Sequence, residues 1–156
     1  MIEIGIPGYR KLVLNHLVLD YNGTLACDGI LQKGVKELLI TLSKKMKIHV
    51  ITADTFGKVR SGMTGIPCDI SIFPAEGQDT GKLEYIRKLD PTHTVCVGNG
   101  RNDRLMLKES ALGIAVILGE GAAIETLMAA DLVCTSITSA LDLLLNPLRL
   151  TATLRS

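Results

Sequence analysis

Short apolar runs alternate along the chain with longer amphipathic stretches, and this alternation predicts a parallel sheet built from β-α-β units. Six apolar runs are predicted strands: 16–20, 47–52, 69–73, 94–98, 113–118 and 131–135. Stretches with apolar positions at helical spacing are predicted helices: 33–45, 79–88, 102–110, 122–130 and 137–145. The expected fold is therefore α/β: a Rossmann-like, doubly wound, mostly parallel sheet with helices on both faces.

The two ends of the chain depart from this alternation. Residues 2–6 alternate apolar and polar positions before a turn at Pro7 and Gly8, which predicts one or two extra strands on the edge of the sheet. After Pro147 no periodic partner is found, so we expect a short edge element or no regular structure there. A chain of 156 residues supports one core, and we expect a single domain over residues 1–156.

The composition of the chain argues against several classes of binding partner. The net charge of +1 gives no general attraction to nucleic acid or anionic lipid, so any charged ligand needs a local site. With no signal peptide and no apolar run of membrane-spanning length, we expect a cytoplasmic protein without a membrane partner. The four cysteines are far apart and form no metal or redox motif, so we expect buried free thiols.

Polar residues follow the predicted strands where ligands of an open parallel sheet bind, outside the carboxyl ends. Asp20 ends the first strand, and Thr52 ends the second. Lys82 lies near the start of a predicted helix, and a loop after the fourth strand supplies Asn99 and Asp103. Taken singly, these residues have ordinary explanations as turn, cap or surface residues. Their shared placement at strand ends favours one anion-binding site.

Two polar loops carry glycines that permit close turns. The first is DYNGTL, with Gly23 and Thr24, and the second is GNGRND, with Gly98, Gly100 and Asn102. The second loop also resembles a dinucleotide-binding fingerprint. That interpretation fails because an aspartate stands at the third glycine position, and because the loop follows a late strand.

Together, DYNGTL at 20–25, VIT at 50–52, Lys82 and GNGRND at 98–103 resemble the four ordered motifs of the haloacid dehalogenase superfamily. The match spans most of the chain. GNGRNDRLMLKESALGIAV is most similar to the GDGxNDxxxLxxAxVGIAM segment in the phosphorylation domain of P-type ATPases, and DYNGTL is similar to their DKTGTL. The resemblance includes neither the membrane helices nor the ATP-binding insertion of a pump, so we do not expect this chain to be a pump.

This resemblance implies a Mg²⁺-dependent phosphohydrolase or phosphotransferase. Asp20 is the implied nucleophile, which forms an aspartyl-phosphate. The implied metal site comprises Asp20, the Asn22 carbonyl, Asp103 and, at a position where the family has aspartate, Asn99. The implied phosphate ligands are Thr52, Ala53 and Lys82, and the positions implied to act in catalysis are Asp20, Asn22, Thr52 and Lys82.

Two departures from the family pattern change the expected activity. Most phosphatases of the family have an acid two residues after the nucleophile, whereas this chain has Asn22. Loss of general acid-base help costs about 10²- to 10⁴-fold in rate, so we expect slow release of the phosphoryl group. Asn99 removes a negative charge from the metal site and should weaken Mg²⁺ binding.

The spacing of the motifs leaves no room for a cap domain, only for a flap between Leu25 and Lys33. An open site favours a phosphorylated substrate of macromolecular size, or closure by a second copy in a homo-oligomer. Two other functions stay open. One is a catalytically impaired relative that binds phosphate or a partner, and the other is a receiver-like domain, which lacks support because no acidic pair precedes the strand of Asp20.

Overall fold

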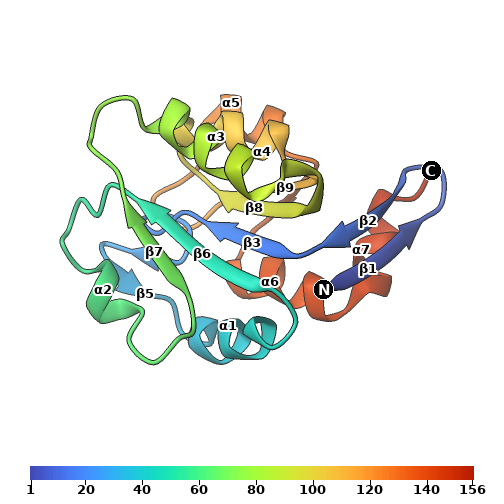
Figure 1. The fold of residues 1–156 in the computed structure, drawn as a ribbon, viewed down its shortest axis with the longest axis horizontal. Coiled ribbons are helices and arrows are strands. Elements are labelled where there is room, and N and C mark those ends of the chain that lie inside the picture. The colour runs from blue at the N-terminus through green and yellow to red at the C-terminus, as the bar shows by residue number, and fades with distance from the viewer.

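The protein is described over residues 1–156 by a computed structural model. The six predicted strands form one parallel sheet at its centre (Figure 1). They are β3 (His16–Leu19), β6 (Lys47–Thr52), β7 (Asp69–Ile72), β8 (Thr94–Gly98), β9 (Leu112–Val116) and β10 (Leu132–Cys134). Their order in space is β10-β9-β8-β3-β6-β7. The predicted α/β architecture is confirmed.

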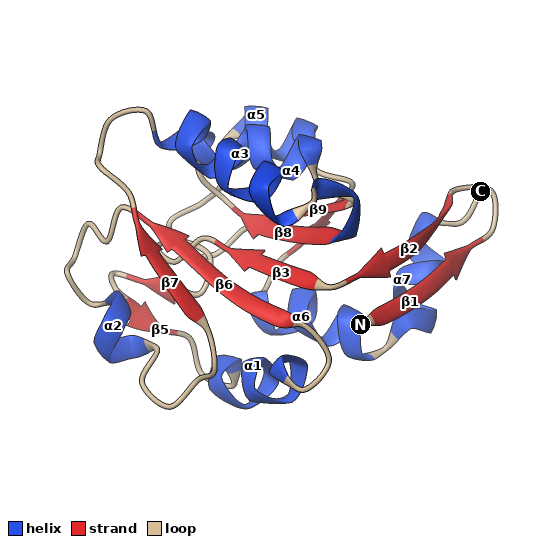
Figure 2. Cartoon of the chain, in the orientation of Figure 1, coloured by secondary structure: helices blue, strands red, loops and turns tan.

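Helices cover both faces of the sheet (Figure 2). Six α-helices lie between or after the strands of this sheet in the sequence: α1 (Val35–Ser43), α2 (Val59–Gly62), α3 (Gln78–Leu89), α4 (Arg104–Glu109), α5 (Ile124–Ala129) and α6 (Ile137–Leu145). On one face, Leu39 of α1 and Leu141 of α6 pack in the larger apolar cluster. On the other face, Ile86 of α3 and Met106 of α4 pack in the smaller one. Burial on both faces explains why the strands are continuous apolar runs.

The direction in which the chain winds reverses at β3. Leu19 pairs with Val50 of β6 on one side and with Val97 of β8 on the other. From β3 the chain first adds β6 and β7, and it then crosses back to add β8, β9 and β10. The carboxyl ends of β3 and β8 therefore flank a topological switch point, where open α/β sheets bind ligands.

The extra N-terminal strands are present, as predicted, but their predicted position on the edge of the main sheet was wrong. Strands β1 (Ile2–Ile6) and β2 (Arg10–Leu14) pair antiparallel in a sheet of their own. Because only Asn15 separates β2 from the central strand β3, the hairpin projects lengthwise from the end of the sheet instead of along its edge (Figure 1).

The C-terminal tail was also mispredicted, because it forms α7 (Pro147–Leu154). Pro147 stands at the first helical position, where its missing N–H is tolerated. Leu150 of this helix is fully buried in the cluster that contains the isoleucines of β1. The partner of this tail is thus the hairpin, at the opposite end of the sequence.

A short hairpin of two two-residue strands follows the first motif, at the position where a cap domain would be inserted. It consists of β4 (Ala26–Cys27) and β5 (Ile30–Leu31), and we call residues 26–31 the flap. Two 3-10 turns complete the structure, η1 (Pro91–His93) and η2 (Arg101–Asp103). The second replaces the first turn of the helix expected from residue 102, so that α4 begins at Arg104.

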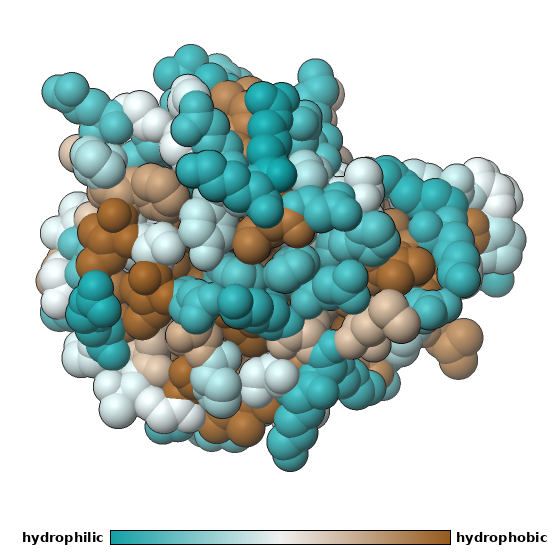
Figure 3. All heavy atoms as spheres, viewed as in Figure 1, coloured by the Kyte–Doolittle hydropathy of each residue, from teal (hydrophilic) through white to brown (hydrophobic).

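Surface and thiol properties follow from this packing. Figure 3 shows a largely hydrophilic surface with hydrophobic patches over the edge strand β7, where Ile72 is exposed. No helix combines the length and the apolar character needed to span a membrane. All four cysteines are free, as expected, but only Cys96 and Cys134 are buried, whereas Cys27 and Cys68 are partly exposed.

Candidate active site

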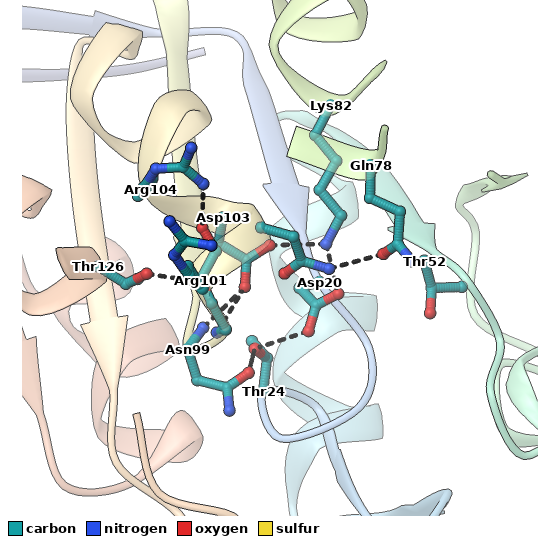
Figure 4. Close-up of polar contacts among 12 residues, drawn as sticks. Asp20, Thr24, Thr52, Gln78, Lys82, Asn99, Arg101, Asp103, Arg104 and Thr126 are labelled. Carbon is teal, nitrogen blue, oxygen red and sulfur yellow. Dashed lines mark hydrogen bonds and ion pairs between the residues drawn. The ribbon is translucent and has the colours of Figure 1, made fainter. Parts of the chain in front are cut away.

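Asp20 lies at the switch point, directly after β3. Its backbone N–H donates to Val97 O of β8 at 3.0 Å, which extends the pairing of the two strands by one residue. Lys82 Nζ donates to Asp20 Oδ1 at 2.7 Å and to Asp103 Oδ1 at 2.6 Å (Figure 4). The Asp20 residue is 6% exposed, and the other two are fully buried. One ammonium therefore joins two buried carboxylates.

The ordinary explanation of Lys82 as a surface lysine is thus excluded. Lys82 is the fifth residue of α3, on the helix face that packs on the sheet. Burial by itself would lower the pKa of Lys82, but the charges of Asp20 and Asp103 raise it above its ordinary value. For Asp20, burial and the charge of Asp103 outweigh Lys82 and raise the pKa to about 6. The three side chains carry a net charge of −1 when all are ionised.

Asp103 organises the loop between β8 and α4. Its Oδ2 accepts hydrogen bonds from the backbone N–H groups of Asn99, at 3.0 Å, and Gly100, at 2.9 Å. A Cβ at Gly98 would lie 2.5 Å from Cγ of Asp103, so the close approach of this loop requires glycine there. Both carboxylate oxygens of Asp103 already have protein donors, one from Lys82 and two from the loop.

Thr24 connects the first loop to the last. Its hydroxyl lies 3.2 Å from Asp20 Oδ2 and 3.2 Å from Asn99 Oδ1. The Asn99 Nδ2 group donates to Gly121 O at 2.9 Å, which turns its Oδ1 toward Thr24. Gly23 has a left-handed φ of 79°, and a Cβ there would lie 2.2 Å from Asn99 Nδ2. Glycine at this position therefore lets the two loops meet.

Thr52 presents its hydroxyl to the same site from the end of β6. It is 1% exposed, and its Oγ1 accepts the backbone N–H of Asp54 at 2.9 Å. Because this oxygen is used as an acceptor, its hydroxyl hydrogen stays available for an anion. Across the site, Asn102 Nδ2 donates to Gln78 Oε1 at 2.6 Å and ties η2 to the start of α3.

A polar cavity opens above Asp20. It is lined by Asp20, Asn22, Thr52, Ala53, Thr55, Gln78, Asn99, Gly100, Asn102 and Glu120. Asn22 Oδ1 is buried and has no hydrogen-bond partner. The cavity thus gathers predicted residues from three segments, whereas Lys82 and Asp103 are buried behind Asp20 and do not line it. It also contains Thr55, Gln78 and Glu120, which the sequence analysis missed. Glu120 follows the carboxyl end of β9, so the strand-end rule would have found it.

The side chains present are compatible with a magnesium ion. The candidate donors are oxygens alone, from the Asp20 carboxylate, the Asn22 backbone carbonyl and the Asn99 amide, which suits a hard cation. Asp20 Oδ2 and Asn99 Oδ1 approach the same Thr24 hydroxyl, so these two oxygens lie on one side of the site. The donor set carries little negative charge, because two of its members are neutral.

Comparison with known proteins identifies sequence relatives. No family model matches the chain. An uncharacterized protein of Methanocaldococcus jannaschii is 49% identical over 74 residues, which are 47% of this chain and 80% of that protein. The copper-transporting ATPase ccc2 of Schizosaccharomyces pombe is 38% identical over 82 residues, 51% of this chain but 9% of the ATPase.

Solved structures share the fold. A 3-deoxy-D-manno-octulosonate 8-phosphate phosphatase from Moraxella catarrhalis, in complex with magnesium and phosphate, has a TM-score of 0.67 at 17% identity, covering 91% of this chain and 94% of its own. The cobalt-bound enzyme from Haemophilus influenzae has a TM-score of 0.70 at 13% identity, covering 92% and 94%. The sheet order and these likenesses agree, and the chain has the fold of haloacid dehalogenase-type phosphatases, without a cap domain.

Proposed function

We propose that this protein is a phosphohydrolase or phosphotransferase that forms an aspartyl-phosphate at Asp20 and uses Mg²⁺. The observation that carries the proposal is the position of the Asp20 carboxylate at the switch point, in a cavity shared with the free hydroxyl hydrogen of Thr52. Lys82 lies at hydrogen-bond distance behind Asp20. A nucleophile, a hydrogen-bond donor for an anion and a buried cation therefore lie together at the switch point.

Each group has a part in this proposal. Asp20 attacks phosphorus, and the Thr52 hydroxyl and the backbone at Ala53 bind phosphoryl oxygens. Lys82 stabilises the negative charge that gathers on the phosphoryl group, in a site where few water molecules compete. The Lys82 ammonium also holds Asp20 in place, because the hydrogen bond from Lys82 to Asp103 fixes the ammonium on its other side. This positioning reduces the motion needed for in-line attack.

Mg²⁺ would neutralise phosphoryl oxygens and orient them toward Asp20. The residues that would hold it are Asp20, the Asn22 carbonyl and Asn99, with Asp103 as a further candidate. Asp103 already accepts three hydrogen bonds from the protein, so its carboxylate supports the loop of Asn99 as well. With neutral amides at two positions, the proposed affinity for Mg²⁺ is modest.

The amide at position 22 determines the expected rate of phosphoryl release. An amide neither donates a proton to a leaving group nor removes one from water at neutral pH. Asp20 should therefore accept a phosphoryl group faster than the site returns it to water. The proposed substrate is a phosphorylated compound, and the absence of a cap admits a large one.

A second candidate is a phosphate-binding protein with little or no turnover. The observation in its favour is that neutral amides stand at both departures from the family pattern, Asn22 and Asn99, and that both line the cavity. Such a protein would keep the anion site formed by Thr52 and Lys82 without the acid-base chemistry.

Phosphate release from p-nitrophenyl phosphate in the presence of Mg²⁺ distinguishes the two candidates. The enzyme should turn over this substrate, and Asp20→Ala should lose that turnover. Asp142→Asn, on α6 and outside the cavity, is the matched control and should keep it. Binding of inorganic phosphate without any turnover would favour the second candidate.

A further inference from the structure

We infer that Glu120 performs part of the general acid-base role that Asn22 lacks the chemistry to perform, so that the slow release of the phosphoryl group depends on Glu120. This inference rests on the proposed function, since it assigns a step to the same site. Among the residues that line the cavity, Asp20 and Glu120 are the only ones with an ionisable side chain. Asp20 is the nucleophile, so Glu120 is the one carboxyl group of the cavity left to carry a proton.

The loop that bears Glu120 is held in place on three sides. The backbone N–H of Gly121 donates to Leu118 O at 2.9 Å and closes a tight turn around Glu120. Gly121 O accepts the side-chain amide of Asn99 at 2.9 Å, which ties the turn to the loop after β8. The backbone N–H of Asp28, at the tip of the flap, donates to Glu120 Oε1 at 3.0 Å.

These contacts fix one carboxylate oxygen of Glu120 and leave the other free to donate or accept a proton. Oε1 is engaged by the flap, whereas the side chain as a whole is exposed. A carboxylate between the flap and the loop of Asn99 lies on the open side of the cavity. In this mechanism a leaving group would depart from that side and water would enter from it, because Lys82 is fully buried behind Asp20 on the other side.

Asn22 lines the cavity but takes no part in moving a proton. Its side-chain oxygen Oδ1 is buried out of reach of solvent, and its amide neither donates nor removes a proton at neutral pH. Glu120 is therefore the residue that moves the proton.

The two steps balance as follows. In the first, an Asp20 oxygen bonds to phosphorus while the bond from phosphorus to the leaving oxygen breaks, and the Glu120 proton passes to that oxygen. In the second, the Glu120 carboxylate takes a proton from water, whose oxygen bonds to phosphorus as the bond to Asp20 breaks. Inorganic phosphate is released, Asp20 is again a carboxylate and Glu120 is again protonated.

Glu120→Gln tests the inference with two substrates of similar shape. Phenyl phosphate has a basic leaving group that needs a proton, and p-nitrophenyl phosphate has a leaving group that does not. The variant should lower kcat/KM for phenyl phosphate by about 10²-fold, with a much smaller effect on p-nitrophenyl phosphate. It should also lengthen the lifetime of the phosphorylated protein, followed by intact mass, by about tenfold or more.

The control variants separate chemistry from structure. Gln at position 120 keeps an acceptor for the Asp28 N–H, so the unfolding midpoint in urea should not change. Glu84→Gln, at an exposed position of α3 outside the cavity, should change neither rate nor lifetime. Glu120→Asp should recover part of the lost rate for phenyl phosphate.

The outcomes distinguish this inference from the proposed function. Unchanged rates and lifetime in Glu120→Gln, with turnover lost in Asp20→Ala, would overturn the role of Glu120 and leave the proposed function standing. An equal loss for both substrates would also overturn it, because a structural defect does not depend on the leaving group. Turnover that survives Asp20→Ala, or no turnover by the unaltered protein, would overturn both.

Discussion

The ammonium of Lys82 lies 2.7 Å from Asp20 Oδ1 although both side chains are almost completely removed from solvent. Asp103 is the second carboxylate on the same ammonium, at 2.6 Å. A buried cation shared by two carboxylates links the stability of the fold to the chemistry of the site. The ion pair that positions Asp20 also makes the removal of Lys82 costly for the stability of the fold.

Replacing Lys82 with Met should therefore destabilise the protein strongly. The variant keeps the apolar stem but leaves two buried carboxylates without a cation, which costs about 3–5 kcal/mol. Urea unfolding followed by circular dichroism measures the change. Lys88→Met, at an exposed position of the same helix, should stay within about 0.5 kcal/mol of the unaltered protein. Equal stabilities of the two variants would show that the buried ion pairs do not form.

Asn22→Asp should raise turnover. The new carboxyl group would stand where most phosphatases of the family have their acid, and we expect an increase of about tenfold or more in kcat with p-nitrophenyl phosphate. Asn15→Asp, which makes the same substitution outside the cavity, should leave kcat unchanged. An unchanged kcat in Asn22→Asp would remove the proposed explanation of slow phosphoryl release.

Asn99→Asp should tighten Mg²⁺ binding. A unit charge about 4 Å from another contributes about 1 kcal/mol even in bulk water, and more for a divalent ion, so the Kd should fall by about tenfold or more. Isothermal titration calorimetry with MgCl₂ measures this directly, without any substrate. A Kd that does not change would argue that Asn99 lies outside the metal site.

Burial of His49 should make the protein less stable as the pH is lowered from about 6.5 to about 4, whereas Asp20, whose pKa is raised to about 6, should contribute in the opposite direction below pH 6. His49 of β6 is 1% exposed, and burial, together with the neighbouring His16, lowers its pKa from 6.5 to about 4. The unfolded chain therefore binds a proton in this window that the folded protein does not bind, which costs on the order of 3 kcal/mol by pH 4. The stabilisation is fully present above pH 6.5.

Urea unfolding at a series of pH values tests this dependence. His49→Gln removes the titrating ring, so lowering the pH from 6.5 to 4 should destabilise the unaltered protein relative to this variant. An identical slope in His49→Gln would assign the pH dependence to other groups.

The site was more predictable than the periphery of the fold. Parallel strands bring their carboxyl ends to one edge, so Asp20, Thr52 and Asn99 could be placed together from sequence order alone. Lys82 was harder, because a lysine in an amphipathic helix is usually solvated, and only its two carboxylate partners account for its burial.

The errors came from contacts between distant parts of the sequence. The apolar face of β1 gave no indication of whether it would join the sheet or pack elsewhere, since its partner Leu150 lies near the other end of the chain. For the same reason α7 lacked a recognisable partner. Glu120 was missed because the loop after β9 has no motif, although it reaches the cavity through its contacts with Asn99 and the flap.

The central claim is that Asp20 accepts a phosphoryl group. The most direct test incubates the protein with Mg²⁺ and acetyl phosphate, quenches with acid and determines the intact mass. We predict a mass increase of one phosphoryl group that is absent in Asp20→Ala and retained in Asp69→Asn, at the amino end of β7. An adduct that persists in Asp20→Ala, or no adduct and no turnover in the unaltered protein, would contradict the claim.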